Sequence, residues 1–164
     1  MTIILKNKET LIYDDFFFRC CIGKRGLIKK KIEGDKKTPI GLFSIGNLYY
    51  RKDRNSKPFT KLKCIPITKN MGWCDDVKNK KFYNKLIKVN RNIRHEKLFR
   101  KDYKYDFIIP INYNSHNRKL GQGSAIFLHL TKNFKPTSGC VALKKKDFLI
   151  LIKLINRKTK IKLT

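Results

Sequence analysis

A histidine and a cysteine in the last third of the chain have the types and spacing of a catalytic base and its nucleophile. His129 lies near the end of the apolar run 124–130, and Cys140 follows after ten intervening residues that include Gly139. A thiol beside an imidazole can form a thiolate–imidazolium pair, which lowers the thiol pKa and yields a nucleophile at neutral pH. Because glycine lets the backbone approach closely, the amide of Cys140, with or without that of Gly139, is a candidate oxyanion donor.

The run 124–130 predicts the strand that presents this histidine. Alternation along a strand places Ile126 and Leu128 on one face and Phe127 and His129 on the other. The following loop is long enough to fold the thiol back toward the imidazole. A lone cysteine is, however, more often a small buried apolar residue, and a lone histidine at a strand end is usually structural. Spacing alone therefore leaves a catalytic and a structural interpretation open.

Most of the remaining chain is predicted to form strands. Strand-like runs occupy residues 2–6, 16–22, 42–50 and 106–112, and residues 161–163 alternate as a last strand. One helix is predicted near the C-terminus, because Phe148, Leu151, Ile152 and Ile155 recur at helical spacing. Residues 51–104 are polar and irregular. Without repeats or a linker, residues 1–164 are expected to form a single, mainly β domain with a C-terminal helix.

The net charge of +28 is compatible with an anionic partner. Lysine and arginine divide 20 and 20 between residues 1–82 and 83–164, and 31 of the 40 are lysine. Arginine is the better bidentate reader of phosphate, and no basic block or tail is present. A non-enzymatic, basic nucleic-acid-binding protein is thus one hypothesis, and an anionic cell-wall polymer explains the charge equally well.

Cysteine usage and apolar runs restrict other classes. The five cysteines are odd in number and contain no C-x-x-C pair, so neither a disulfide framework nor a zinc site built from Cys20, Cys21, Cys64, Cys74 and His95 is favoured. Reduced thiols, no metal and no cofactor are expected. No run of 18 apolar residues predicts a membrane span, and the N-terminus does not resemble a signal peptide.

Two segments together resemble the YkuD-like L,D-transpeptidase catalytic domain family. In that family a strand-borne histidine precedes a Ser/Thr-His-Gly-Cys motif, and Thr137-Ser138-Gly139-Cys140 stands in that place here. Upstream, residues 38–43, Thr-Pro-Ile-Gly-Leu-Phe, are similar to the family's Thr-Pro-x-Gly-x-Phe segment. The resemblance spans roughly residues 28–155.

The resemblance implies catalytic roles residue by residue. Cys140 corresponds to the nucleophile and His129 to the base, while Gly139 and Ser138 stand where the family positions substrate and stabilises the oxyanion. Ser138 replaces the family's histidine before Gly-Cys, and Ala142 replaces a common arginine, so the chain is a variant whose Ser138 hydroxyl can still donate one hydrogen bond.

Further residues resemble a subgroup of this family. Trp73, Asp75, Tyr83, Tyr113 and Asn114 are predicted to bind substrate, although a structural hydrogen-bond network explains such residues equally well. His95-Glu96 offers either a second base or a salt-linked loop pair, and His116 is expected to face solvent. The Thr38–Gly41 segment is expected to be structural, because Pro39 fixes its own φ and Gly41 supplies backbone freedom at the entry of the next strand.

The family implies a mixed β-sheet sandwich and cysteine-dependent acyl transfer on peptidoglycan stem peptides, for cell-wall biosynthesis. The thioester on Cys140 would pass to an amine, as in an L,D-transpeptidase, or to water, as in an L,D-carboxypeptidase. The expected partner is therefore the stem peptide, with no stable nucleic-acid partner, and the protein is expected to be a monomer. The substrate implies the cell envelope or periplasm. Since no signal peptide is visible, a cytoplasmic location is the alternative.

Overall fold

The structure is a computed structural model that describes residues 1–89 and 91–164, and β-strands dominate it. The bounds of the elements are β1 Thr2–Asn7, β2 Thr10–Tyr13, β3 Phe16–Cys21, β4 Leu27–Ile28, β5 Thr38–Pro39, β6 Gly41–Ser44, β7 Leu48–Tyr50, β8 Cys64–Pro66, β9 Met71–Cys74, β10 Leu86–Lys88, β11 His95–Lys97, β12 Phe107–Pro110, β13 Phe127–Leu130, β14 Val141–Leu143, α1 Lys145–Leu154 and β15 Lys160–Leu163.

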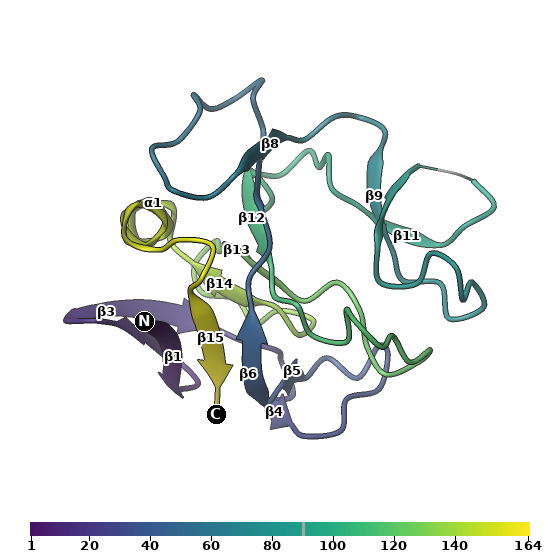
Figure 1. The fold of residues 1–164 in the computed structure, drawn as a ribbon, viewed down its shortest axis with the longest axis horizontal. Helices are drawn as coiled ribbons and strands as arrows, with labels where there is room; N and C mark the ends of the chain where they lie inside the picture. Colours follow the sequence, from purple (N-terminus) through teal and green to yellow (C-terminus); the bar gives the residue numbers. More distant parts are fainter. Residues whose placement is uncertain (90) are drawn as a thin grey trace.

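Ten of these strands form one mixed sheet in the order β6-β15-β1-β2-β3-β14-β13-β12-β7-β8. The pairs β1–β15, β13–β14 and β7–β8 are parallel, and the other pairs are antiparallel. The sheet curls, because the end of β6 meets the end of β12 through an Ile45–Ile111 bridge and a bond from the Asn112 amide to the Ser44 carbonyl. Figure 1 shows β6 below β12. The two strands are close although they are seven positions apart in the strand order of the sheet.

The main core fills the curl. Inward residues of β1 and β15, such as Ile3, Leu5 and Ile161, are fully buried, and helix α1 covers one end of the curl (Figure 1). The four residues that predicted this helix, Phe148, Leu151, Ile152 and Ile155, are all 0% exposed. The one-sided apolar pattern of α1 is therefore satisfied by packing onto the sheet.

A smaller sheet lies beside the curl and supports a second apolar cluster. It has the order β10-β9-β11, with both outer strands antiparallel to β9. The second cluster joins Tyr105, Phe127 and Cys140 to Trp73 of β9, whose ring meets that of Phe127 edge-on at 5.2 Å. The two clusters lie on opposite faces of β13, and Cys140 belongs to the second one, while the His129 ring meets that of its member Tyr105 edge-on at 5.2 Å.

The predicted fold class, a mainly β mixed sheet with a C-terminal helix, is confirmed. Residues 42–50 nevertheless form two strands, β6 and β7, instead of one, and residues 51–104 contain the unpredicted small sheet. The strand expected at 124–130 begins only at Phe127, because Ala125 has a φ of +52°. Gly41 has a φ of +153°, and a Cβ there would lie 2.5 Å from the Phe43 ring, so its backbone freedom is required. Among the described residues, no helix is long and apolar enough to cross a membrane.

Candidate active site

The parallel register of β13 and β14 brings the predicted nucleophile and base to one face of the sheet. His129 pairs with Ala142 and Leu128 with Val141, so Cys140, the residue before β14, lies beside Phe127. Ile126, Leu128 and Val141 enter the main core, as alternation predicted for the first two. Cys140 and His129 are thus diagonal neighbours across the strand pair. Ordinary strand spacing and rise place their Cα atoms about 8 Å apart. Both side chains line the same cavity.

The Cys140 thiol is buried and bonded to backbone. Its Sγ accepts the Phe127 amide at 3.3 Å and donates to the Ala125 carbonyl at 3.3 Å. Burial raises the pKa of this thiol to about 12, and the nearby charge of Glu96 adds to the shift. At neutral pH the sulfur therefore carries its proton, which points toward Ala125.

His129 is buried and neutral. Burial lowers its pKa to about 4, although the Leu130 carbonyl partly offsets that shift. The Nδ1 atom lies 2.8 Å from this carbonyl, which can only accept, so Nδ1 carries the proton and Nε2 is the unprotonated nitrogen. His129 is thus held in the tautomer that can take a proton through Nε2.

The thiolate–imidazolium pair expected from the sequence is therefore wrong for the resting structure. An ion pair would need two charges at largely buried positions, and the bonds from the Phe127 amide and to the Leu130 carbonyl do not offset the desolvation cost. The pair rests instead as a neutral thiol beside a neutral imidazole.

The loop before Cys140 is held by the Thr-Pro segment. The Thr38 hydroxyl, fully buried, accepts the Gly23 amide at 2.9 Å and donates to the Gly139 carbonyl at 2.8 Å. Gly139 has a φ of +135°, and a Cβ there would lie 2.8 Å from the Lys37 carbonyl oxygen. The segment is structural, as expected, and its structural role is to fix the backbone next to the nucleophile.

Thr137 and Ser138 have different surroundings. The Thr137 hydroxyl donates to the Cys140 carbonyl at 2.6 Å and accepts the Gly139 amide at 3.1 Å. Because the Gly139 amide already donates to Thr137, it is not free to bind an oxyanion. The Cys140 amide is therefore the remaining backbone candidate for that role. Ser138 is exposed and lines the cavity, where its hydroxyl can reach a ligand.

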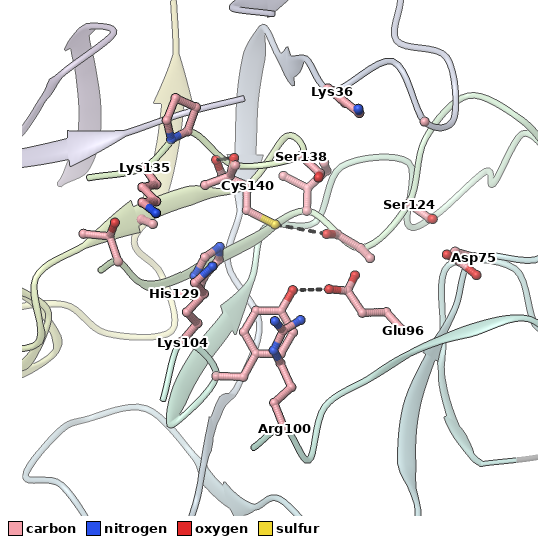
Figure 2. Close-up of a pocket in the computed structure, with 18 of the residues that line it drawn as sticks. Lys36, Asp75, Glu96, Arg100, Lys104, Ser124, His129, Lys135, Ser138 and Cys140 are labelled. Atoms are coloured by element: carbon pink, nitrogen blue, oxygen red, sulfur yellow. Dashed lines mark hydrogen bonds between the residues drawn. The ribbon is translucent and has the colours of Figure 1, made fainter. Parts of the chain in front are cut away.

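The cavity around the thiol has a volume of about 440 Å³, and its wall carries charges of both signs, including Arg94, which pairs with Asp75. Figure 2 shows Lys36, Asp75, Ser124 and Glu96 on one side of Cys140, and His129, Lys104 and Lys135 on the other. Glu33 belongs to the first side, because the Ser124 hydroxyl donates to its Oε2 at 2.7 Å.

Lys31 forms part of the cavity wall close to the Cys140 loop. It is 4% exposed, pairs with Asp35, and its Nζ lies 3.5 Å from the position a Gly139 Cβ would take. Its positive charge acts to lower the pKa of Cys140 against the larger effect of burial. Lys31 is the cation best placed to favour negative charge developing at the thiol.

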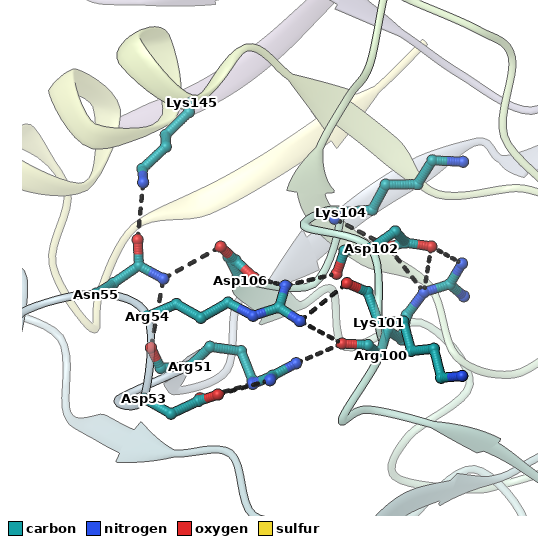
Figure 3. A network of polar contacts seen from close by, with 10 residues as sticks. All are labelled: Arg51, Asp53, Arg54, Asn55, Arg100, Lys101, Asp102, Lys104, Asp106 and Lys145. Carbon is teal, nitrogen blue, oxygen red and sulfur yellow. Dashed lines mark hydrogen bonds and ion pairs between the residues drawn. The ribbon is translucent and has the colours of Figure 1, made fainter.

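A polar network fixes the loop that carries the basic side (Figure 3). The Arg54 guanidinium donates to the carbonyls of Arg100, Lys101 and Asp102 at 2.9–3.0 Å and to the Asp106 carboxylate at 3.1 Å. Arg51 also bonds the Arg100 carbonyl, at 2.5 Å. Because the loop backbone is held in this way, Arg100 and Tyr105 reach the cavity in fixed positions, with the Arg100 guanidinium 4.8 Å from the Tyr105 ring centre.

Of the five predicted substrate-binding residues, only Asp75 lines the cavity. Its pKa is raised by burial, while Arg94, 3.3 Å away, acts in the opposite direction. Trp73, Tyr83, Tyr113 and Asn114 lie in the shell of residues behind the cavity wall.

Asn84 connects most of that shell. Its side-chain oxygen accepts the Trp73 indole at 2.8 Å and the Ala125 amide at 3.1 Å, and its nitrogen donates to the carbonyls of Tyr113 and Asn114 at 2.9 and 2.8 Å. The Tyr83 hydroxyl donates to Glu33 at 2.5 Å. These residues thus form the structural hydrogen-bond network that was the alternative to substrate binding. Through the Ala125 amide, the network positions the Ala125 carbonyl, which accepts the Cys140 thiol.

Several cavity residues were missed by sequence reasoning, notably Lys31, Glu33, Arg100 and Lys104. Glu96 was considered only with His95, yet adjacent strand residues face opposite sides. Glu96 faces the cavity and accepts the Tyr105 hydroxyl, whereas His95 Nδ1 lies 2.7 Å from the Ile93 carbonyl. All five cysteines are free, and the described residues contain no group of three or more His, Cys, Asp or Glu arranged to hold a metal.

Thr38→Val should destabilise the protein, since it removes the hydroxyl that joins Gly23 to Gly139 and leaves two buried backbone groups unpaired. We expect the free energy of unfolding in urea to fall by about 1–3 kcal/mol. Thr38→Ser keeps the hydroxyl and is the matched control, with a smaller loss. Equal stability of the two variants would contradict this role.

Comparison with known proteins agrees with the resemblance seen in the sequence. A family model described as YkuD, L,D-transpeptidase catalytic domain, matches residues 1–163. Neither a curated protein nor a solved structure matches the chain.

Proposed function

Because the chain belongs to the L,D-transpeptidase catalytic domain family, whose members use a cysteine nucleophile, we propose that it transfers acyl groups from peptidoglycan stem peptides through a thioester on Cys140. The observation that carries this proposal is that the parallel register of β13 and β14 brings Cys140, just before β14, and His129 of β13 to one cavity. The bond attacked is the L,D-peptide bond, and the terminal D-residue leaves.

The first step starts from the neutral pair. As a substrate carbonyl reaches the sulfur, the thiol proton moves from its bond with the Ala125 carbonyl to Nε2 of His129, and sulfur attacks the carbonyl carbon. The developing oxyanion is stabilised by the Cys140 amide, with the Ser138 hydroxyl as a second donor. The C–N bond then breaks, and His129 returns the proton to the leaving amine.

The second step releases the acyl group. An acceptor amine attacks the thioester carbonyl and gives a proton to His129, the C–S bond breaks, and sulfur regains a proton from the imidazolium. With water in place of the amine the same steps give a carboxypeptidase.

The catalytic residues should contribute unequally to turnover of a stem tetrapeptide, followed by chromatography of the products. Cys140→Ala should abolish turnover, and His129→Ala should lower kcat by several orders of magnitude, because nucleophile and base act as a unit. Ser138→Ala should cost less, since one hydroxyl donor contributes at most about 2.7–4 kcal/mol. A near-normal rate for His129→Ala together with an inactive His95→Ala would overturn the assignment of the base.

The acid limit of activity should lie well below that of an ordinary histidine. With its pKa lowered to about 4, His129 remains a neutral base down to acidic pH and loses this role only as the pH falls through that value. We expect kcat/KM on a soluble stem peptide to stay nearly level from pH 7.5 down to about 5.5 and to decline below about 5. A decline centred near pH 6.5, the ordinary histidine value, would contradict the neutral buried imidazole.

A further inference from the structure

One half of the main sheet presents a row of apolar side chains on its solvent side. We call this solvent side of β6, β15, β1, β2 and β3 the outer face; the alternate residues of the same strands point inward and fill the main core. The strand registers place one outward residue of each strand directly opposite the next, in the order Leu42, Lys162, Ile4, Ile12 and Phe17. Backbone pairing therefore fixes the row, with neighbouring strands about 5 Å apart.

The apolar members of the row are in contact with water. Phe17 is 66% exposed, Leu42 55% and Ile4 40%, and Ile12, between Ile4 and Phe17, is partly buried. Apolar residues that are exposed singly are common on protein surfaces. Here three successive strands, β1, β2 and β3, each present one at the same level of the sheet, so the exposed area is contiguous. Contiguous apolar area of this kind marks a surface that binds something.

Cations border the row. Lys162 is a member of it, and Lys160 lies two residues away on the same side of β15. The Nζ atom of Lys6 lies 6.0 Å from the centre of the Phe17 ring, and Arg19 follows Phe17 on the same side of β3. None of these four cations takes part in the five ion pairs among the described residues. Their positive charge is thus available to a partner.

No carboxylate lies within the five strands of the outer face. The acidic residues of the two hairpins, Glu9, Asp14 and Asp15, occupy the turns at the strand ends, and β6 and β15 contain none. An apolar row bordered by unpaired cations matches a partner that offers both hydrocarbon and negative charge. The surface of an anionic bilayer offers both, because apolar side chains enter the boundary between headgroups and acyl chains while lysines remain at the headgroups.

We propose that the outer face binds the surface of an anionic lipid bilayer, with Ile4 and Phe17 entering the interface and Lys6, Lys160 and Lys162 contacting the headgroups. A soluble anionic polymer matches this face less well, because it would leave the apolar row in water. A second copy of the chain also matches less well, because two outer faces would bring their unpaired cations together. The proposal is independent of acyl transfer, since the outer face shares no residue with the Cys140 cavity.

Co-sedimentation with vesicles measures the binding. The protein should sediment with vesicles of phosphatidylglycerol and phosphatidylcholine and stay in solution with phosphatidylcholine alone. Phe17→Ser removes the most exposed side chain of the row, and Lys160→Gln together with Lys162→Gln removes two of its cations. Each of these two variants should weaken partition into the anionic vesicles at least about tenfold.

Matched controls lie in the loop before β8, which Figure 1 shows at the top of the molecule, away from β1, β3 and β15. Phe59→Ser removes another exposed phenylalanine, and Lys61→Gln together with Lys63→Gln removes another pair of exposed lysines with the same spacing. Each control should weaken partition less than about threefold, because the charge it removes or the ring it shortens lies off the outer face.

A tryptophan at position 17 reports insertion directly. The emission of Phe17→Trp should move to shorter wavelength on anionic vesicles and be quenched by lipids brominated in their acyl chains. The parent is the control, because its single tryptophan, Trp73, packs against the second cluster and should show neither change. If Phe17→Ser fails to fold, the quenching experiment decides alone.

Three results would overturn the proposal. Equal losses from both lysine pairs, with full binding by Phe17→Ser, would reduce vesicle binding to an unselective effect of the net charge of +28. Unquenched Phe17→Trp, together with polyphosphate binding that depends on Lys160 and Lys162, would assign the outer face to a soluble polymer. A concentration-dependent dimer in sedimentation velocity that Phe17→Ser abolishes would assign it to a second copy of the chain.

Discussion

The parallel register between β13 and β14 is the constraint on which the site depends. Leu128 opposite Val141 puts the apolar residues of both strands into the main core and turns Cys140 and His129 to the other face. A slip of one residue would exchange the faces, moving Leu128 out of the main core into the second cluster and Phe127 the other way. The Thr38 hydroxyl helps to hold this register where the chain enters β14, because it donates to the carbonyl of Gly139, the residue before Cys140.

Burial determines the chemistry available at this face. Burial of the two side chains keeps the thiol of Cys140 and the imidazole of His129 neutral, so no preformed ion pair is present. In the proposed mechanism the reactivity comes instead from the unprotonated Nε2 of His129 and from Lys31, which favours negative charge as it develops at the sulfur. A nucleophile that is activated only when substrate arrives is also protected from oxidation and from unproductive reactions, since thiolate character governs both.

Local patterns predicted part of this arrangement. Alternation along residues 126–129 was sufficient to assign faces to Ile126 and His129, and the helical spacing of Phe148 and Leu151 located α1, because these signals depend only on near neighbours. The charged cavity wall could not be predicted in this way, since Glu33 and Glu96 meet only after the chain has folded. The protonation of Cys140 depends on burial by distant segments for the same reason, and Trp73 proved to support the wall through Asn84 instead of lining it.

The most direct test of the central claim is the mass of the intact protein after mixing with a stem tetrapeptide, followed by peptide mapping. The account predicts a transient adduct equal to the tetrapeptide minus its terminal D-residue, located on Cys140, and absent when His129 is replaced by alanine. An adduct on another cysteine, such as the half-buried Cys64, or an adduct that retains the D-residue, would contradict it.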